Sequence, residues 1–101
     1  MRMLARVKMP IEPFNSLVRN GTAGKVIGKI IESVKPESIY FTEMDGQRGC
    51  IMIVDVADPS QVPAIAEPFF LAFNALVEFH IVMSAEELGK AGLDALGKQW
   101  A

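Results

Sequence analysis

The run at residues 49–56, GCIMIVDV, is the feature that most constrains the fold of this 101-residue chain. It is apolar at almost every position, is rich in β-branched residues and is followed by the turn-forming sequence DPS. A strand that is apolar on both of its faces is typical of the centre of a sheet, covered above and below. We therefore expect 49–56 to be a central strand around which the other elements are arranged.

Two further strands and a hairpin are predicted before it. In residues 2–9 apolar positions alternate with mostly charged ones, which is the two-residue period of a strand, and Pro10 ends the run. Residues 38–43 alternate in the same way. Asp45-Gly46 then separates this run from the central strand, and an Asp-Gly pair in that position is a strong signal for a tight hairpin.

Residues 14–34 carry apolar side chains at helical spacing. Asn20-Gly21 predicts a break in this helix, with Thr22 capping its second half. Gly24 and Gly28 fall roughly on the predicted buried side, where small residues let a helix pack closely on a sheet. A less favoured interpretation is that they leave room for a ligand.

A helix, a strand and a final helix are predicted after the central strand. Asp58 or Ser60 is expected to cap the helix that runs to Phe73, with Pro68 kinking it. Residues 76–83 alternate as a fourth strand. The sequence SAEE at 84–87 is a capping box for a last helix, whose apolar side carries Leu88, Ala91, Leu96 and Trp100. The chain is thus predicted to be one domain, residues 1–101, of class α+β with the order β-α-β-β-α-β and a four-stranded antiparallel sheet, plus a C-terminal helix.

Sorting the strand residues by parity predicts two unlike sheet faces. One is uniformly apolar and is expected to pack against the helices; Cys50 falls on it, as a buried and inert thiol. The other face mixes charged and apolar side chains and would leave an apolar patch in water in a monomer. We therefore predict a homodimer formed through this open face, although the C-terminal helix of the same chain is an alternative cover. The patch consists of Leu4, Tyr40, Ile51, Ile53 and Val82.

Several segments carry a family resemblance, namely KPESIYFTE at 35–43, DPS at 58–60, AEPFF at 66–70 and MSAEEL at 83–88. With the predicted element order, the chain resembles the dimeric α+β-barrel superfamily of ferredoxin-like domains, which includes antibiotic-biosynthesis-monooxygenase-like and muconolactone-isomerase-like domains. The segments are most similar to an uncharacterised bacterial family within it. The resemblance implies two sheets packed face to face, with ligands held between a sheet and its own helices or at the mouth of the barrel. No catalytic motif is carried over, and a fold does not determine a function.

The candidate functional residues lie mostly on the open face. His80, the only histidine, shares a face with Glu78 two residues away, so the carboxylate could orient the imidazole as a base. Arg6 and Tyr40 are the other catalytic candidates, and the competing interpretation is that all of these groups pair or pack within the dimer interface. Candidate ligand-binding residues are Arg19, Gly21 and Glu78, the first two at the predicted helix break.

Composition excludes several classes of function. The net charge is −2, which disfavours binding to nucleic acid or to an anionic membrane. RNA-binding domains of similar topology need aromatic residues on the open face of the central strands, where this chain has Leu4, Arg6, Ile51 and Ile53. One cysteine and one histidine cannot form a disulfide or a Cys/His zinc site, and we expect neither a metal nor a cofactor. No stretch has the length of a membrane span, and charges interrupt the first eight residues, so a cytoplasmic location is expected.

Two functions follow as hypotheses. The first is a small homodimeric protein that binds a small, partly apolar molecule or serves as a structural domain. The alternative is a cofactor-independent isomerase or monooxygenase-like enzyme that uses Arg6, His80 and Tyr40.

Overall fold

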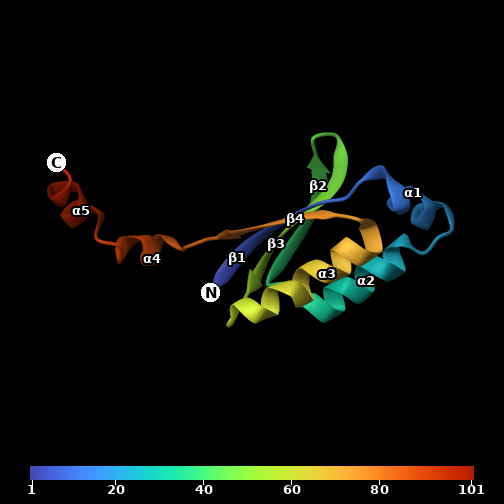
Figure 1. Ribbon diagram of the computed structural model, residues 1–101, viewed down its shortest axis with the longest axis horizontal. Helices are drawn as coiled ribbons and strands as arrows, with labels where there is room; N and C mark the ends of the chain where they lie inside the picture. Colours follow the sequence, from blue (N-terminus) through green and yellow to red (C-terminus); the bar gives the residue numbers. More distant parts are fainter.

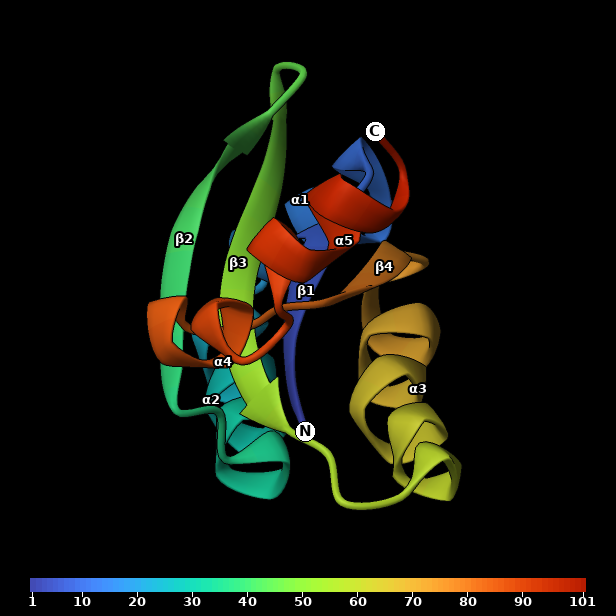
Figure 2. The ribbon, with the colours of Figure 1, turned by 90° about the vertical axis from the view of Figure 1, so that its left-hand side faces the viewer.

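The structure is built around one four-stranded antiparallel sheet, with spatial strand order β2-β3-β1-β4 (Figures 1 and 2). The computed structural model describes residues 1–101. The strands are β1 (Arg2–Lys8), β2 (Ser38–Met44), β3 (Gln47–Asp55) and β4 (Leu76–Ile81); the helices are α1 (Ile11–Arg19), α2 (Ala23–Val34), α3 (Val62–Phe73), α4 (Ala85–Gly89) and α5 (Leu93–Gln99), with a 3₁₀ turn, η1 (Pro59–Gln61). This α+β architecture is compatible with a ferredoxin-like fold.

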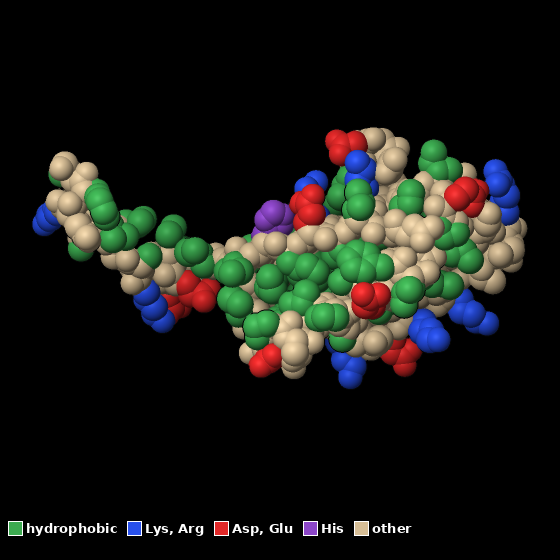
Figure 3. All heavy atoms as spheres, in the orientation of Figure 1, with side chains coloured by type: hydrophobic (Ala, Val, Ile, Leu, Met, Phe, Trp, Pro, Cys, Tyr) green, Lys and Arg blue, Asp and Glu red, His purple; other side chains and the backbone are tan.

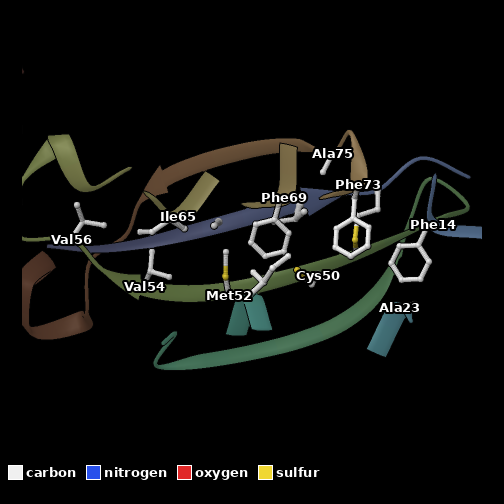
Figure 4. Close-up of a cluster of buried hydrophobic side chains, with 14 residues drawn as sticks. Phe14, Ala23, Cys50, Met52, Val54, Val56, Ile65, Phe69, Phe73 and Ala75 are labelled. Carbon is white, nitrogen blue, oxygen red and sulfur yellow. The ribbon is translucent and has the colours of Figure 1, made fainter. Parts of the chain in front are cut away.

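The core lies between one face of the sheet and helices α1, α2 and α3 (Figure 4). Cys50, Met52 and Val54 of β3 point into it and are at most 2 % exposed, as their parity predicted. The ring of Phe14 stacks on that of Phe73 with centroids 5.0 Å apart, which joins α1 to the end of α3. The buried cluster consists of Ala5, Val7, Met9, Phe14, Ala23, Ile30, Cys50, Met52, Val54, Val56, Ile65, Phe69, Phe73 and Ala75.

The hairpin between β2 and β3 turns at the predicted residues. Asp45 and Gly46 both have positive φ, of 53° and 76°, which is the backbone of the tight turns that suit twisted hairpins. The carboxylate of Glu43 accepts a hydrogen bond from the Gly46 N–H at 2.8 Å. The turn therefore sets the register that pairs Tyr40 with Ile51.

Gly49 allows a close approach at the point where β3 leaves this hairpin. A Cβ at Gly49 would lie 2.8 Å from the carbonyl oxygen of Val7 and 3.0 Å from two side-chain atoms of Met44. The missing side chain lets Met44 lie flat on the open face of the sheet, where it is only 7 % exposed. Packing therefore requires a glycine at position 49.

The helix predicted over 14–34 is two helices, and the break falls at residues 20–22 as expected. Thr22 occupies the cap position of α2, but its side chain makes no capping hydrogen bond. The prediction that Gly24 and Gly28 face the core is wrong: both are exposed, with no atom within 4 Å of a Cβ placed on either. Ala23 and Ile30, which were also expected on the buried side, do face the core.

The C-terminal segment also differs from the prediction. The single last helix is interrupted, because Gly92 adopts a left-handed backbone with φ of 71° between α4 and α5. The segment does not fold over the open face of its own sheet but extends away from the body (Figure 1). The molecule is 60 Å long, and its radius of gyration is 17.1 Å, where a compact chain of this length would have about 13 Å.

The apolar face is covered less completely than its composition predicted. Phe41 on β2 and Ile81 at the end of β4 are 52 % and 64 % exposed, and Met83 beyond β4 is 59 % exposed. The helices cover the middle of the sheet and leave these positions open. Helix α3 runs from Val62 to Phe73 without interruption, although Pro68 lies inside it.

Replacing Gly49 by alanine should destabilise the fold by about 1–3 kcal/mol, because the new methyl group overlaps backbone that cannot move aside. The matched control is Gly28→Ala in α2, where the space is open. That substitution should stabilise the protein by about 0.5–1 kcal/mol through helix propensity. Urea unfolding followed by circular dichroism measures both changes, and equal effects of the two substitutions would contradict this account of Gly49.

Candidate functional site

The open face of the sheet presents side chains in transverse rows that follow from the strand register. One row runs Tyr40, Ile51, Arg6, Glu78, and the next runs Ser38, Ile53, Leu4, His80. The ionisable groups Arg6, Glu78 and His80 lie on β1 and β4, whereas Tyr40, Ile51 and Ile53 lie on β2 and β3. Leu4 on β1 and Ser38 on β2 are the exceptions to this separation. The face is therefore divided into a polar half and a largely apolar half.

Arg6, Glu78 and His80 form one hydrogen-bonded cluster in the polar half. Arg6 Nη1 donates to Glu78 Oε2 at 3.1 Å, and His80 Nε2 lies 3.3 Å from the same oxygen. The hydrogen bond with His80, followed by the positive charge of Arg6, lowers the pKa of the Glu78 carboxyl. All three side chains are about half exposed in the subunit, so they are accessible to a ligand or to a second chain.

A small hollow of about 120 Å³ adjoins this cluster at the hairpin end of the sheet. Lys8 Nζ lies there 3.2 Å from Asp45 Oδ2. Two ion pairs, Lys8–Asp45 and Arg6–Glu78, therefore line the hollow. Met44, whose side chain fills the space over Gly49, forms part of its wall. Its lining residues are Arg6, Lys8, Met44, Asp45, Leu76 and Glu78. Sequence reasoning did not predict this hollow.

The predicted apolar patch, which also includes Leu4 on β1 and Val82 after β4, is present but unevenly exposed. Tyr40 is 70 % exposed, whereas Leu4, Ile51, Ile53 and Val82 are half-buried by their neighbours. Tyr40 lies two strands from Arg6, a distance of about 10 Å between backbones. Within one subunit the structure therefore does not bring Tyr40 to the His80 cluster.

The candidates at the helix break lie elsewhere. Arg19 ends α1, at the far end of the molecule from the C-terminus (Figure 1), and its guanidinium is 3.7 Å from a carboxylate oxygen of Glu12. Gly21 lies in the turn that follows, with φ of 78°. Neither residue joins Glu78, so the three predicted ligand-binding residues do not form one site.

Cys50 has the environment of a structural thiol. It is completely buried among the core side chains, and burial raises its pKa to about 11. The thiolate that a nucleophile requires is therefore scarce at neutral pH. Its position agrees with the prediction from strand parity.

Comparison with known proteins adds no assignment: no family model matches the chain, and no curated protein matches it. None of the helices is both long enough and apolar enough to cross a membrane.

The hydrogen bond between Glu78 and His80 predicts the acid titration of this site. Because the pKa of Glu78 is lower in the folded chain than in the unfolded chain, its stabilising contribution is full above the unfolded pKa. That contribution is lost as the pH falls through the folded value. Titration of the Glu78 carboxyl carbon by NMR should give a midpoint below that of glutamate in an unstructured peptide, and His80→Ala should raise it.

Thr42→Ala is the control for this titration, because Thr42 lies on the same face but on β2. It should leave the Glu78 midpoint unchanged. A wild-type midpoint equal to the peptide value would show that the cluster does not hold the carboxylate.

Proposed function

We propose that this chain acts as a homodimer in which two open sheet faces meet and enclose a small, partly apolar ligand. The observation that carries the proposal is the division of the open face into an apolar half and the Arg6–Glu78–His80 cluster. Tyr40 and Leu76, 70 % and 66 % exposed, are large apolar surfaces that a second subunit would remove from water. Two copies related by a two-fold axis present the same patch to each other.

The polar half supports an acidic group on the ligand. Arg6 and Lys8 project from β1 toward the same hollow, where Arg6 has a planar guanidinium suited to a carboxylate. Their present partners, Glu78 and Asp45, are exposed carboxylates whose pairs contribute little by themselves. The N–H donors of Arg6 and Lys8 that these partners leave free can bind a ligand carboxylate, while the ligand's apolar part contacts residues such as Ile51.

The two faces of β3 provide a test of the dimer. Ile53 lies on the open face, half-buried, whereas Val54 points into the core and is 2 % exposed. Ile53→Asp should yield a folded monomer, because it places a charge in the interface alone. Val54→Asp should unfold the subunit, at a cost of about 3 kcal/mol or more. Sedimentation velocity and circular dichroism separate these outcomes. A wild-type protein that sediments as a monomer at micromolar concentration would contradict the dimer.

Thermal-shift measurements test ligand binding. Aromatic and medium-chain carboxylates should raise the melting temperature of the wild type, since a ligand that binds the native state stabilises it. The neutral amides of the same compounds should raise the melting temperature less. Arg6→Gln should abolish the preference for the acid, while Lys25→Gln on the exposed surface of α2 serves as the control. Equal shifts of the melting temperature by the acids and the amides would show that Arg6 does not bind an acidic group of the ligand.

A second candidate function is proton transfer, and the Glu78–His80 contact favours it. A carboxylate that holds an imidazole orients it as a general base, and Arg6 beside it can stabilise a developing oxyanion. The reaction class is a cofactor-independent isomerisation. Incorporation of solvent deuterium into a bound carboxylate, lost in His80→Ala, would distinguish this enzyme from a protein that only binds.

A further inference from the structure

Residues 84–101, here called the C-terminal arm, carry large apolar side chains that have no cover within their own subunit. Every residue of the arm is exposed. Leu88, Leu93, Leu96 and Trp100 are 45, 58, 43 and 79 % exposed. The spacing of the last three places them on one side of α5. Such a stripe on a helix indicates a surface that is buried in the working state.

The arm cannot depend on its own helices for order. α4 has five residues and α5 has seven, while isolated helices shorter than about 12–15 residues are marginal in water. Within α4, the side chain of Ser84 and that of Glu87 cap each other's backbone N–H groups. These local bonds define where the helix starts, but packing against another surface has to supply the remaining stability.

The connection to the body directs the arm outward in line with β4. The Val82 N–H donates to the carbonyl oxygen of Arg2 at 3.3 Å, which extends the pairing with β1 beyond the end of the strand. The pKa of Arg2 is raised, chiefly by its hydrogen bond with Glu37 and also by the charge of Glu87. The pairing with β1 therefore continues to Val82, two residues before Ser84 caps α4.

The apolar side of the arm points the same way as the open face of the sheet. In Figure 3 the apolar side chains over the arm gather mainly on its upper side, the side from which His80, the only histidine, projects, and the charged groups of α4 lie below. A body that rests on the open face is thus also positioned above the arm.

The size of the open face supports the same conclusion. Four strands about 4.8 Å apart and about 20 Å long present a flat area of about 400 Å². A stable interface usually buries about 800 Å² on each partner. The arm, which lies outside this sheet, provides additional apolar area of the kind that is required.

The charges of the arm disfavour a lipid surface as its partner. It carries three carboxylates, Glu86, Glu87 and Asp94, against two lysines, Lys90 and Lys98. Helices that lie on anionic membranes are instead rich in Lys and Arg on their polar side. A second copy of the chain, which offers a matching apolar face, fits the arm better.

We propose that the C-terminal arm packs against the second subunit of the dimer, so that each subunit is clasped by the arm of its partner. This inference rests on the dimer proposed above and extends its interface from the sheet to Leu88, Leu93, Leu96 and Trp100. Exchange of a terminal segment between identical chains is a common route to dimers.

Trp100 is the only tryptophan of the chain and reports directly on this contact. In the dimer its emission should be blue-shifted and protected from acrylamide. On dilution of the full-length protein, this protection should be lost in step with dissociation measured by sedimentation. Leu96→Asp should weaken self-association by at least about tenfold and expose Trp100 at concentrations where the wild type is dimeric.

Ala95→Asp is the matched control, because helical spacing places Ala95 outside the apolar stripe, about 100° from Leu96 and about 140° from Trp100 around the helix axis. It should leave both measurements unchanged. Misfolding is not expected to confuse the result, since the buried core cluster ends at Ala75, before the arm.

The possible failures are distinguishable. A Leu96→Asp protein that dimerises like the wild type, or a wild-type dimer in which acrylamide reaches Trp100 freely, overturns the arm contact and leaves the dimer standing. A wild type that is monomeric throughout overturns both proposals. Protection of Trp100 that persists in the dissociated monomer shows that the arm folds onto its own sheet, and this also overturns the inference.

Discussion

The antiparallel pairing of β1 with β3 is the contact on which the rest of the structure depends. It joins two strands that are distant in sequence, from Arg2 opposite Asp55 to Lys8 opposite Gly49, and it places both in the middle of the sheet. Each strand then meets two different environments. Val7 and Cys50 face the helices and are completely buried, while Arg6 and Ile51 on the reverse face are left for other contacts. Moving this register by one residue would exchange the two environments.

The parts of the fold that depend on local pattern were predictable. Alternation placed Cys50 and Val54 in the core, and Asp45-Gly46 identified the hairpin because few other residue pairs accept two positive φ values. The orientation of α2 was not predictable from its glycines, because Ala23 and Ile30 determine which side is buried. The open positions Phe41 and Ile81 depend on where the helices end over the sheet, which is tertiary information.

The candidate site shows the same division between pattern and geometry. Parity brought Glu78 and His80 to one face, and their contact exists. The pairing of Arg6 with Glu78 follows from the strand order, which a single sequence indicates only through the fold. The hollow beside them is lined by residues of β1, of the β2–β3 hairpin and of β4, which only the tertiary structure brings together. A hollow between distant segments leaves a weaker signal in a sequence than a charged residue does.

The position of the core along the chain has a consequence for the order of events during synthesis. All residues of the buried cluster lie between Ala5 and Ala75, and the partly buried residues that pack on it end at Phe79. A nascent chain therefore contains every group needed for its core before the segment beyond β4 has been made. Because the core needs no group of the arm, the body can fold without association, and any association of folded bodies is a bimolecular step whose rate depends on their concentration.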